Sequence, residues 1–191
     1  MLSSKFEQAL VYAAKAHAEQ KRKGTDIPYL AHLLGVASIA LEYGANEDEA
    51  IAALLHDAVE DAGGFARLED IKSRFGENVA GIVAACTDAY VVPKPPWRER
   101  KERYIEHIAQ ASKSARLVSA ADKLHNARSI LKDHRVEGEA LWSRFNGGRE
   151  GTLWYYRTLV EAFRSIENDE LIDEFDRVVG EIEMSANKTK N

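Results

Sequence analysis

The chain has 191 residues, of which 45% are hydrophobic and 30% charged, and its formal net charge is −5. A chain of this length can bury a substantial core within one compact domain. The acidic balance argues against general nucleic-acid binding, which favours strongly basic domains. A single cysteine, Cys86, excludes a disulfide within the chain and indicates a reducing compartment.

The N-terminal residues 1–23 lack the continuous apolar segment of a signal peptide. No stretch of the chain has the apolar length that a membrane helix requires. We therefore expect a cytoplasmic protein whose partner is a small molecule and neither a nucleic acid nor a membrane. The sequence leaves the oligomeric state open.

Helical periodicity dominates the first third of the chain. Apolar residues recur at three- and four-residue steps over residues 6–18, which predicts a first helix. Gly24 and Pro28 interrupt it, and a second helix is expected over residues 29–43, before Gly44. These breaks separate the first two helices by a basic loop.

A capping box predicts the start of the third helix. Asn46 and Glu49 have the required spacing, and the helix "EDEAIAALLHDAV" is expected over residues 47–59. The glycine pair at 63–64 should end this segment and open a loop. Further helices are predicted over residues 67–75, 77–89, 97–111, 114–133, 151–166 and 169–183.

The remaining segments have non-helical patterns. The proline-rich residues 91–97, "VVPKPPW", predict a loop, and the tail 185–191 is expected to be disordered. Convincing alternating strand patterns are absent from the sequence. The predicted fold is therefore all-α, a single domain over residues 1–184 that forms a compact bundle of about eight to ten helices.

Four ionisable residues follow an apolar run in "AALLHDAVED". Neighbours on a helix are about 100° apart, so His56 and Asp57 can reach one ion beside the helix edge. Glu60 and Asp61 follow four residues later and join the same flank if the helix continues. Such a cluster is unfavourable against an apolar helix unless a divalent cation compensates the charges.

Two further residues are candidate ligands because their surroundings are apolar. His32 precedes Leu33 on the second predicted helix, and Asp122 follows Ala121. Two histidines and two carboxylates suit manganese, iron or zinc with positions open for water. The simpler alternatives are a hydrogen-bonded, half-buried His32 and an Asp122 that pairs with Arg128 or a lysine.

The order of these residues, H…HD…D, resembles the HD phosphohydrolase superfamily. The segments "KRKGTDIPYLAH", "AALLHDAVED", "RFGENVAGIVAACTD" and "AADKLHNARSI" are similar to the hydrolase domain of RelA/SpoT-type alarmone enzymes. The later "LWYYRTLVEAF" resembles the short, hydrolase-only members of that family. The combination of "HDxxED" with "ADKLHN" is specific, whereas an isolated HD pair is not.

This resemblance implies a metal-dependent hydrolase of the stringent response. The enzyme would convert guanosine-3′,5′-bis(diphosphate), ppGpp, to GDP and pyrophosphate. One divalent ion, Mn²⁺ in the relatives, would be held by four residues: His32, His56, Asp57 and Asp122. Glu60 and Asp61 would orient and deprotonate the attacking water. The substrate would be bound by Arg22, Lys23, Tyr29, Asn126 and Arg128.

Two positions depart from the family pattern and leave the substrate open. Ala62 replaces the usual threonine, and Ser119 replaces a frequent lysine. The same hydrolytic site could act on an adenine alarmone, NADPH or a nucleoside phosphate. A nucleotide-sensing binding protein is the alternative of a different class.

Other polar residues allow either a functional or a structural interpretation. The basic residues Lys94, Arg98, Arg100, Lys101 and Arg103 are candidates for phosphate contacts. For most of them, the interleaved acidic residues favour a solvated helix face. His125, three residues after Asp122, is a minor candidate for an additional metal ligand.

Overall fold

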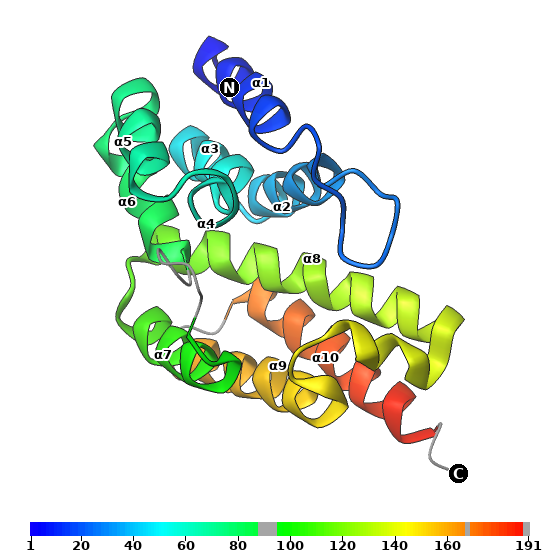
Figure 1. Cartoon of the computed structure of the whole chain (residues 1–191). Helices are drawn as coiled ribbons and strands as arrows, with labels where there is room; N and C mark the ends of the chain where they lie inside the picture. The colour runs from blue at the N-terminus through cyan, green and yellow to red at the C-terminus, as the bar shows by residue number, and fades with distance from the viewer. Residues whose placement is uncertain (88–94, 167–168, 189–191) are drawn as a thin grey trace.

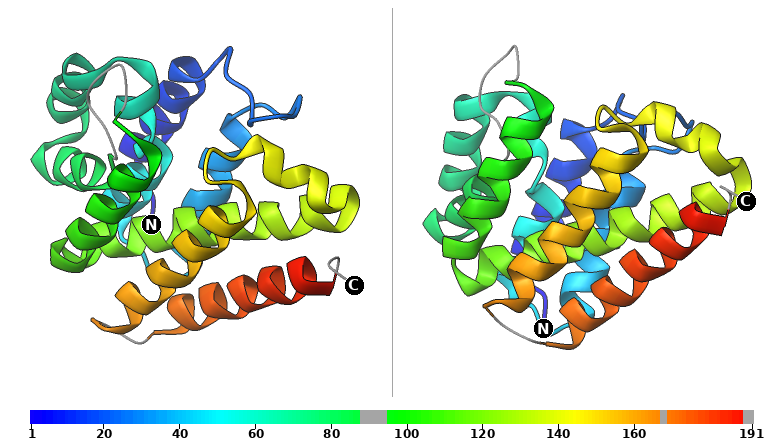
Figure 2. Two further views of the ribbon diagram at one scale, coloured as in Figure 1. Left: turned by 60° about the horizontal axis from the view of Figure 1, so that its bottom comes forward. Right: turned by 90° about the horizontal axis from the view of Figure 1, so that it is seen from below.

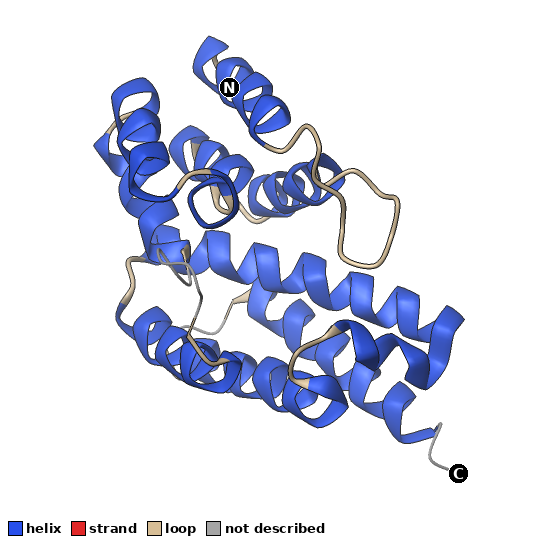
Figure 3. Ribbon diagram, in the orientation of Figure 1, coloured by secondary structure: helices blue, strands red, loops and turns tan. Residues whose placement is uncertain are grey.

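The fold is entirely helical within the residues that the computed structural model describes, 1–87, 95–166 and 169–188 (Figures 1 and 3). The helices are α1 (Ser4–Ala16), α2 (Leu30–Glu42), α3 (Glu47–Leu55), α4 (Ala58–Ala62), α5 (Gly64–Phe75), α6 (Glu77–Cys86), α7 (Trp97–Gln110), α8 (Lys113–Glu137), the 3₁₀ helix η1 (Gly138–Arg144), α9 (Gly148–Arg164) and α10 (Glu170–Lys188). The predicted all-α class is confirmed.

Helix α8, with 25 residues, is the central element of the bundle. It contacts α2, α3 and α6 on one side and α9 and α10 on the other, and α10 runs along it (Figures 1 and 2). Buried residues from Ala9 to Ala186 form one hydrophobic core. No helix in the described part of the chain combines the length and apolar character needed to cross a membrane.

The third predicted helix is divided where the ionisable cluster begins. The Asn46–Glu49 capping box is present, but α3 ends at Leu55 and α4 begins at Ala58. The His56 ring donates from Nδ1 to the carbonyl of Ala53 at 2.8 Å. An unbroken helix would offer that carbonyl to the amide of residue 57, so a side chain competes with the helical hydrogen bond.

Two other boundaries differ from the predictions. A loop was expected from Gly63 and Gly64 onward, but α5 begins at Gly64. The connection is therefore the single residue Gly63, whose φ is +139°. The C-terminal helix continues through residues 185–188, which were predicted to be disordered, because the fully buried Ala186 extends its apolar stripe. Residues 189–191 and most of the proline-rich loop, 91–94, lie outside the described residues.

The basic loop between α1 and α2 is folded back on itself. The amide of Arg22 donates to Ile27 at 2.8 Å, and the amide of Tyr29 donates to Gln20 at 2.9 Å. Gly24, with φ +74°, allows the reversal and lies against the Arg144 side chain of η1. The loop thereby packs against η1.

Candidate metal centre and adjoining cavity

Four potential ligand atoms converge from three parts of the bundle. His32 lies on α2, His56 and Asp57 in the α3–α4 turn, and Asp122 on α8. Nε2 of His56 is 3.0 Å from Asp57 Oδ2 and 3.6 Å from Asp122 Oδ1. Nε2 of His32 is 3.6 Å and 3.2 Å from the same two oxygens. The structure therefore brings the four residues of the predicted ligand set together.

These atoms are arranged around a common point and are not bonded to one another. Both Nε2 atoms are buried, and neither has a hydrogen-bond partner. A cation with bonds of about 2.1 Å holds neighbouring ligands about 3.0–3.4 Å apart, close to the observed 3.0–3.6 Å between these atoms. His32, His56 and Asp57 also form the one candidate metal group among the described residues. The four side chains fit a divalent ion.

Charge coupling within the cluster is strong. Burial alone would raise the pKa of Asp57 and lower that of His56. Their mutual attraction, with Asp122 contributing, instead raises the pKa of His56 well above its usual range and holds that of Asp57 well below it. The nitrogen that faces the carboxylates therefore carries a proton when no cation compensates their charge.

Neighbouring side chains hold the Asp122 carboxylate in place. Lys123 Nζ donates to Oδ2 at 2.5 Å, and Asn126 Nδ2 donates to Oδ1 at 2.5 Å. Burial would raise the pKa of Asp122, but Lys123 and the two imidazoles keep it well below its usual range. The carboxylate is thus fixed and ionised.

His125 is not a fifth member of the ligand cluster. Its Nδ1 lies 2.9 Å from Nδ1 of His32, on the side of that ring away from the carboxylates. Burial, with smaller contributions from His32 and Arg22, lowers the pKa of His125 to about 4. The His125 ring is therefore neutral near pH 7.

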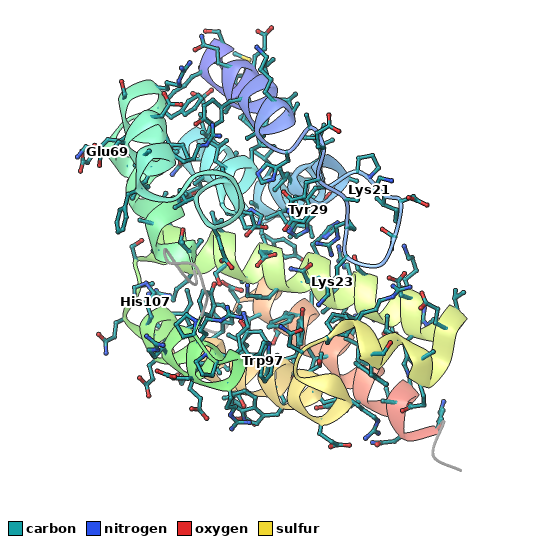
Figure 4. All side chains as sticks on the ribbon, viewed as in Figure 1. Lys21, Lys23, Tyr29, Glu69, Trp97 and His107 are labelled. Atoms are coloured by element: carbon teal, nitrogen blue, oxygen red, sulfur yellow. The ribbon has the colours of Figure 1, made fainter. Side chains whose placement is uncertain are left out.

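A cavity of about 370 Å³ adjoins the cluster and contains Asp57, Glu60 and Asp122 in its wall. Cationic side chains from separate elements line it: Arg22, Lys23, Arg100, Lys101 and Lys123. Tyr29 lies above α8 and Trp97 below it in the view of Figure 4, and both contribute to this wall. Such a cavity suits a ligand with several negative charges.

A second cavity of about 440 Å³ lies next to the first. Arg22, Lys23, Tyr29 and Asn126 line both cavities. Arg22 donates to the Asn126 side chain at 2.7 Å, so this pair stands where the two spaces meet. Together the cavities offer room in the range of typical ligand sites.

Not every residue predicted for the site is brought to it. Arg128 lines neither cavity and instead pairs with Glu174 of α10 at 2.9 Å. Arg128 therefore lies away from both cavities, because its helix position faces α10, and its contact with the substrate stays a prediction. Asp61 belongs to α4, but its side chain lies outside the described residues.

The basic stretch of α7 divides into two groups. Arg100 and Lys101 line the first cavity. Arg98 and Arg103 form surface pairs with Glu102 and Glu99, as the alternative of a solvated face predicted. Lys94 lies outside the described residues.

Sequence reasoning missed Lys123 and assigned no role to Trp97. Lys123 follows Asp122 directly in "ADKLHN", and its proximity to a buried carboxylate was the available signal. Trp97 packs against Gly147 and Gly151 of the α9 region, where a Cβ atom would lie 2.6 Å and 3.2 Å from its ring. No local pattern reveals that contact.

Comparison with known proteins agrees with this geometry. The HD domain family matches residues 9–153. The chain belongs to the HD domain family. It is 42% identical over 128 residues to the guanosine-3′,5′-bis(diphosphate) 3′-pyrophosphohydrolase MESH1 of Xenopus tropicalis, covering 65% of this chain and 69% of that protein. The human MESH1 is 34% identical over 170 residues, covering 83% of this chain and 90% of that protein.

The fold of this HD domain protein also matches a solved structure. A protein described as a metazoan ortholog of SpoT that hydrolyses ppGpp superimposes with a TM-score of 0.78 and 32% sequence identity. The match covers 93% of this chain and 95% of the other. The chain is therefore a homologue of the MESH1-type small ppGpp hydrolases, as the motifs indicated.

Proposed function

We propose that the protein is a metal-dependent phosphohydrolase that converts ppGpp to GDP and pyrophosphate. One observation carries this proposal: a buried cluster of two histidines and two aspartates opens into a cavity lined by five cationic side chains. A metal ligand set beside a cavity with several cationic side chains is what phosphoester hydrolysis requires. The choice of ppGpp as the substrate follows from the homologues, which are named as ppGpp 3′-pyrophosphohydrolases.

We propose that one divalent ion, Mn²⁺ in preference to others, is held by His32, His56, Asp57 and Asp122. A set of two imidazoles and two carboxylates suits such a transition ion. When bound, the ion supplies Lewis-acid polarisation of a phosphoryl oxygen and lowers the pKa of water. The residues that hold it contribute rigidity, because Ala53, Lys123 and Asn126 fix their orientation.

Glu60 is the proposed proton acceptor for the attacking water. Its side chain lines the first cavity beside Asp57, one helical turn after the ligands. The water oxygen bonds to the phosphorus that carries the ribose 3′ oxygen, and its proton passes to the Glu60 carboxylate. The bond between that phosphorus and the 3′ oxygen breaks, and the 3′ oxygen takes a proton from solvent to become the hydroxyl of GDP. General-base assistance of this kind contributes about 10²–10⁴-fold to the rate. Asp61 is the second proposed acid–base residue, on the basis of the sequence alone.

The cavities suggest how the nucleotide binds. Lys101, Arg100 and Lys123 pair with the 3′ diphosphate in the first cavity. Arg22 and Asn126 contact the ribose where the cavities meet, and the base enters the second cavity. Lys23 and Tyr29 complete the wall on the loop side.

A cytoplasmic location is proposed too, because the free thiol of Cys86 suits a reducing compartment.

A nucleotide panel tests the substrate assignment. The purified chain, freed of metal and reloaded with Mn²⁺, is incubated with ppGpp, pppGpp, an adenine alarmone, NADPH and GTP. Release of pyrophosphate and of orthophosphate is measured separately. We expect pyrophosphate and GDP from ppGpp. The Asp57→Ala variant, prepared identically, controls for contaminating phosphatases.

Two other outcomes of the nucleotide panel would contradict the proposal. Turnover of another nucleotide with ppGpp untouched would disprove the substrate but leave the hydrolytic site in place. A protein that binds no divalent ion and hydrolyses nothing after Mn²⁺ addition would support the nucleotide-sensing alternative.

A further inference from the structure

His125 lies beside a proposed metal ligand without belonging to the ligand set. Its Nδ1 is 2.9 Å from Nδ1 of His32, and the two ring centroids are 4.8 Å apart. Two imidazoles can share such a contact only if one nitrogen carries a proton and the other accepts it. The position of the proton therefore decides which nitrogen of His32 has a free lone pair.

The geometry of the centre fixes this choice. Nε2 of His32 faces Asp57 and Asp122 and has no hydrogen-bond partner. To present a lone pair to a cation there, the His32 ring must carry its proton on Nδ1. Nδ1 of His125 is then the acceptor.

We infer that His125 is a positioning residue that holds His32 in its metal-binding tautomer by accepting a hydrogen bond from Nδ1. This inference rests on the metal site of the proposed function. It assigns His125 a role in orienting a ligand and none in contacting the cation.

Comparison of the two histidine ligands explains why α8 supplies the acceptor. His56 donates from Nδ1 to the carbonyl three residues earlier, that of Ala53. The equivalent carbonyl for His32 belongs to Tyr29, and it already accepts from the amides of His32 and Leu33 at 2.9 Å and 3.4 Å. A carbonyl oxygen has two lone pairs, so the His32 ring needs an acceptor from elsewhere.

Gly35 provides an independent indication that the contact is built into the fold. It lies on α2, one turn after His32, and a Cβ atom there would overlap Cδ2 and Nε2 of the His125 ring. Glycine is unfavourable in a helix interior. Its presence allows the His125 ring to lie directly on the α2 backbone, within reach of His32.

The test measures Mn²⁺ affinity of the metal-free full-length chain by competition with a chelator. In His125→Asn an amide oxygen can take the place of Nδ1, whereas His125→Phe keeps a ring without an acceptor. We expect His125→Phe to weaken Mn²⁺ binding about 10–100-fold, and His125→Asn to restore it to within a few-fold of the parent. His134→Phe is the matched control, since His134 is also buried on α8 but bonds Ser185.

Two results would overturn the inference. One is a His125→Phe affinity within twofold of the parent. The other is an equal loss in the Asn and Phe variants, which would indicate a packing role. Thermal melts of the metal-free variants identify misfolding. If His125→Phe does not fold, Gly35→Ala displaces the ring with a better helix former, and an unchanged Mn²⁺ affinity would again contradict the inference.

The same measurement separates this inference from the proposed function. A parent chain that binds no Mn²⁺ would refute the metal site itself. A parent chain that binds Mn²⁺ and hydrolyses ppGpp, with a His125→Phe variant of equal affinity, would refute only the role of His125.

Discussion

The Tyr29 hydroxyl donates a 2.6 Å hydrogen bond to Oδ2 of Asp57, the same oxygen that lies 3.0 Å from Nε2 of His56. A residue at the start of α2 thus orients a carboxylate in the α3–α4 turn. The phenol ring also stacks against His17, with centroids 5.3 Å apart, which keeps it in place. Tyr29 therefore connects the basic loop to the metal centre.

Removing this hydroxyl should weaken metal binding without displacing the loop. Tyr29→Phe keeps the ring stacked on His17 but loses a charge-assisted hydrogen bond to a ligand, so we expect Mn²⁺ affinity to fall about tenfold. Chelator competition measures the change. Tyr12→Phe is the control, because it loses a similar 2.7 Å bond to Asp70 between α1 and α5. Equal affinities for Tyr29→Phe and the parent would exclude the orienting role.

Asp57 and Glu60 of the α3–α4 segment have different proposed roles, metal binding and proton transfer, so their variants should have different defects. Asp57→Ala should abolish Mn²⁺ binding and activity together. Glu60→Gln should keep the metal, because Glu60 is outside the ligand cluster, and should reduce kcat about 10²–10⁴-fold. Metal content and single-substrate kinetics of both variants test this. Loss of metal in Glu60→Gln would show that Glu60 is itself a ligand.

The stability of the metal-free protein should depend on pH with a predictable sign. The pKa of His56 is raised well above its usual 6.5 in the folded protein. The contribution of His56 to folding stability is therefore complete below pH 6.5, and it is lost as the pH rises through the pKa of the folded protein. The lowered pKa values of Asp57 and Asp122 act oppositely, and their contribution is lost only as pH falls below their usual 3.8. The metal-free protein should therefore be most stable between these limits.

Metal binding should reverse the alkaline part of this dependence. Mn²⁺ requires deprotonated nitrogens, so it competes with the proton on His56 and binds more tightly as pH rises. We expect the Mn²⁺-induced increase in Tm to be larger at pH 8.5 than at pH 6.5. Thermal melts with chelator and with Mn²⁺ at several pH values provide the measurement. An increase that is independent of pH would contradict a protonated metal-free cluster.

Arg22 and Arg128 should differ sharply despite their similar predicted roles. Arg22 bonds Asn126 between the two cavities, so Arg22→Ala should raise KM for ppGpp at least tenfold. Arg128→Ala should leave kcat/KM within about twofold and cost at most about 1 kcal/mol of stability, because its pair with Glu174 is partly exposed. Steady-state kinetics and denaturant unfolding distinguish them. A large kinetic defect in Arg128→Ala would show that Arg128 contacts the substrate.

The clustering of the proposed ligands could be predicted from the sequence because each is a polar residue in an apolar helical context. His32 beside Leu33 and Asp122 beside Ala121 signal burial that requires compensation. The helical class followed equally from periodicity. These features are local, so spacing and composition are sufficient to reveal them.

The supporting contacts could not be predicted in the same way, because they depend on how helices rotate against each other. His125 was considered only as a ligand, yet the orientation of α8 against Gly35 places it behind His32. Arg128 shares a helix with Asn126, yet its direction brings it to Glu174. The break after Leu55 likewise arises from a side chain that binds backbone, which helical periodicity does not reveal.

The basic loop between α1 and α2 has a consequence for how this scaffold can diversify. The proposed metal ligands come from α2, the α3–α4 turn and α8, whereas much of the cavity wall comes from that loop, α7 and α9. Chemistry and molecular recognition are therefore encoded in largely separate segments. If the proposed function holds, we expect substitutions in the loop or in α7 to change which nucleotide is accepted while the proposed metal ligands are kept.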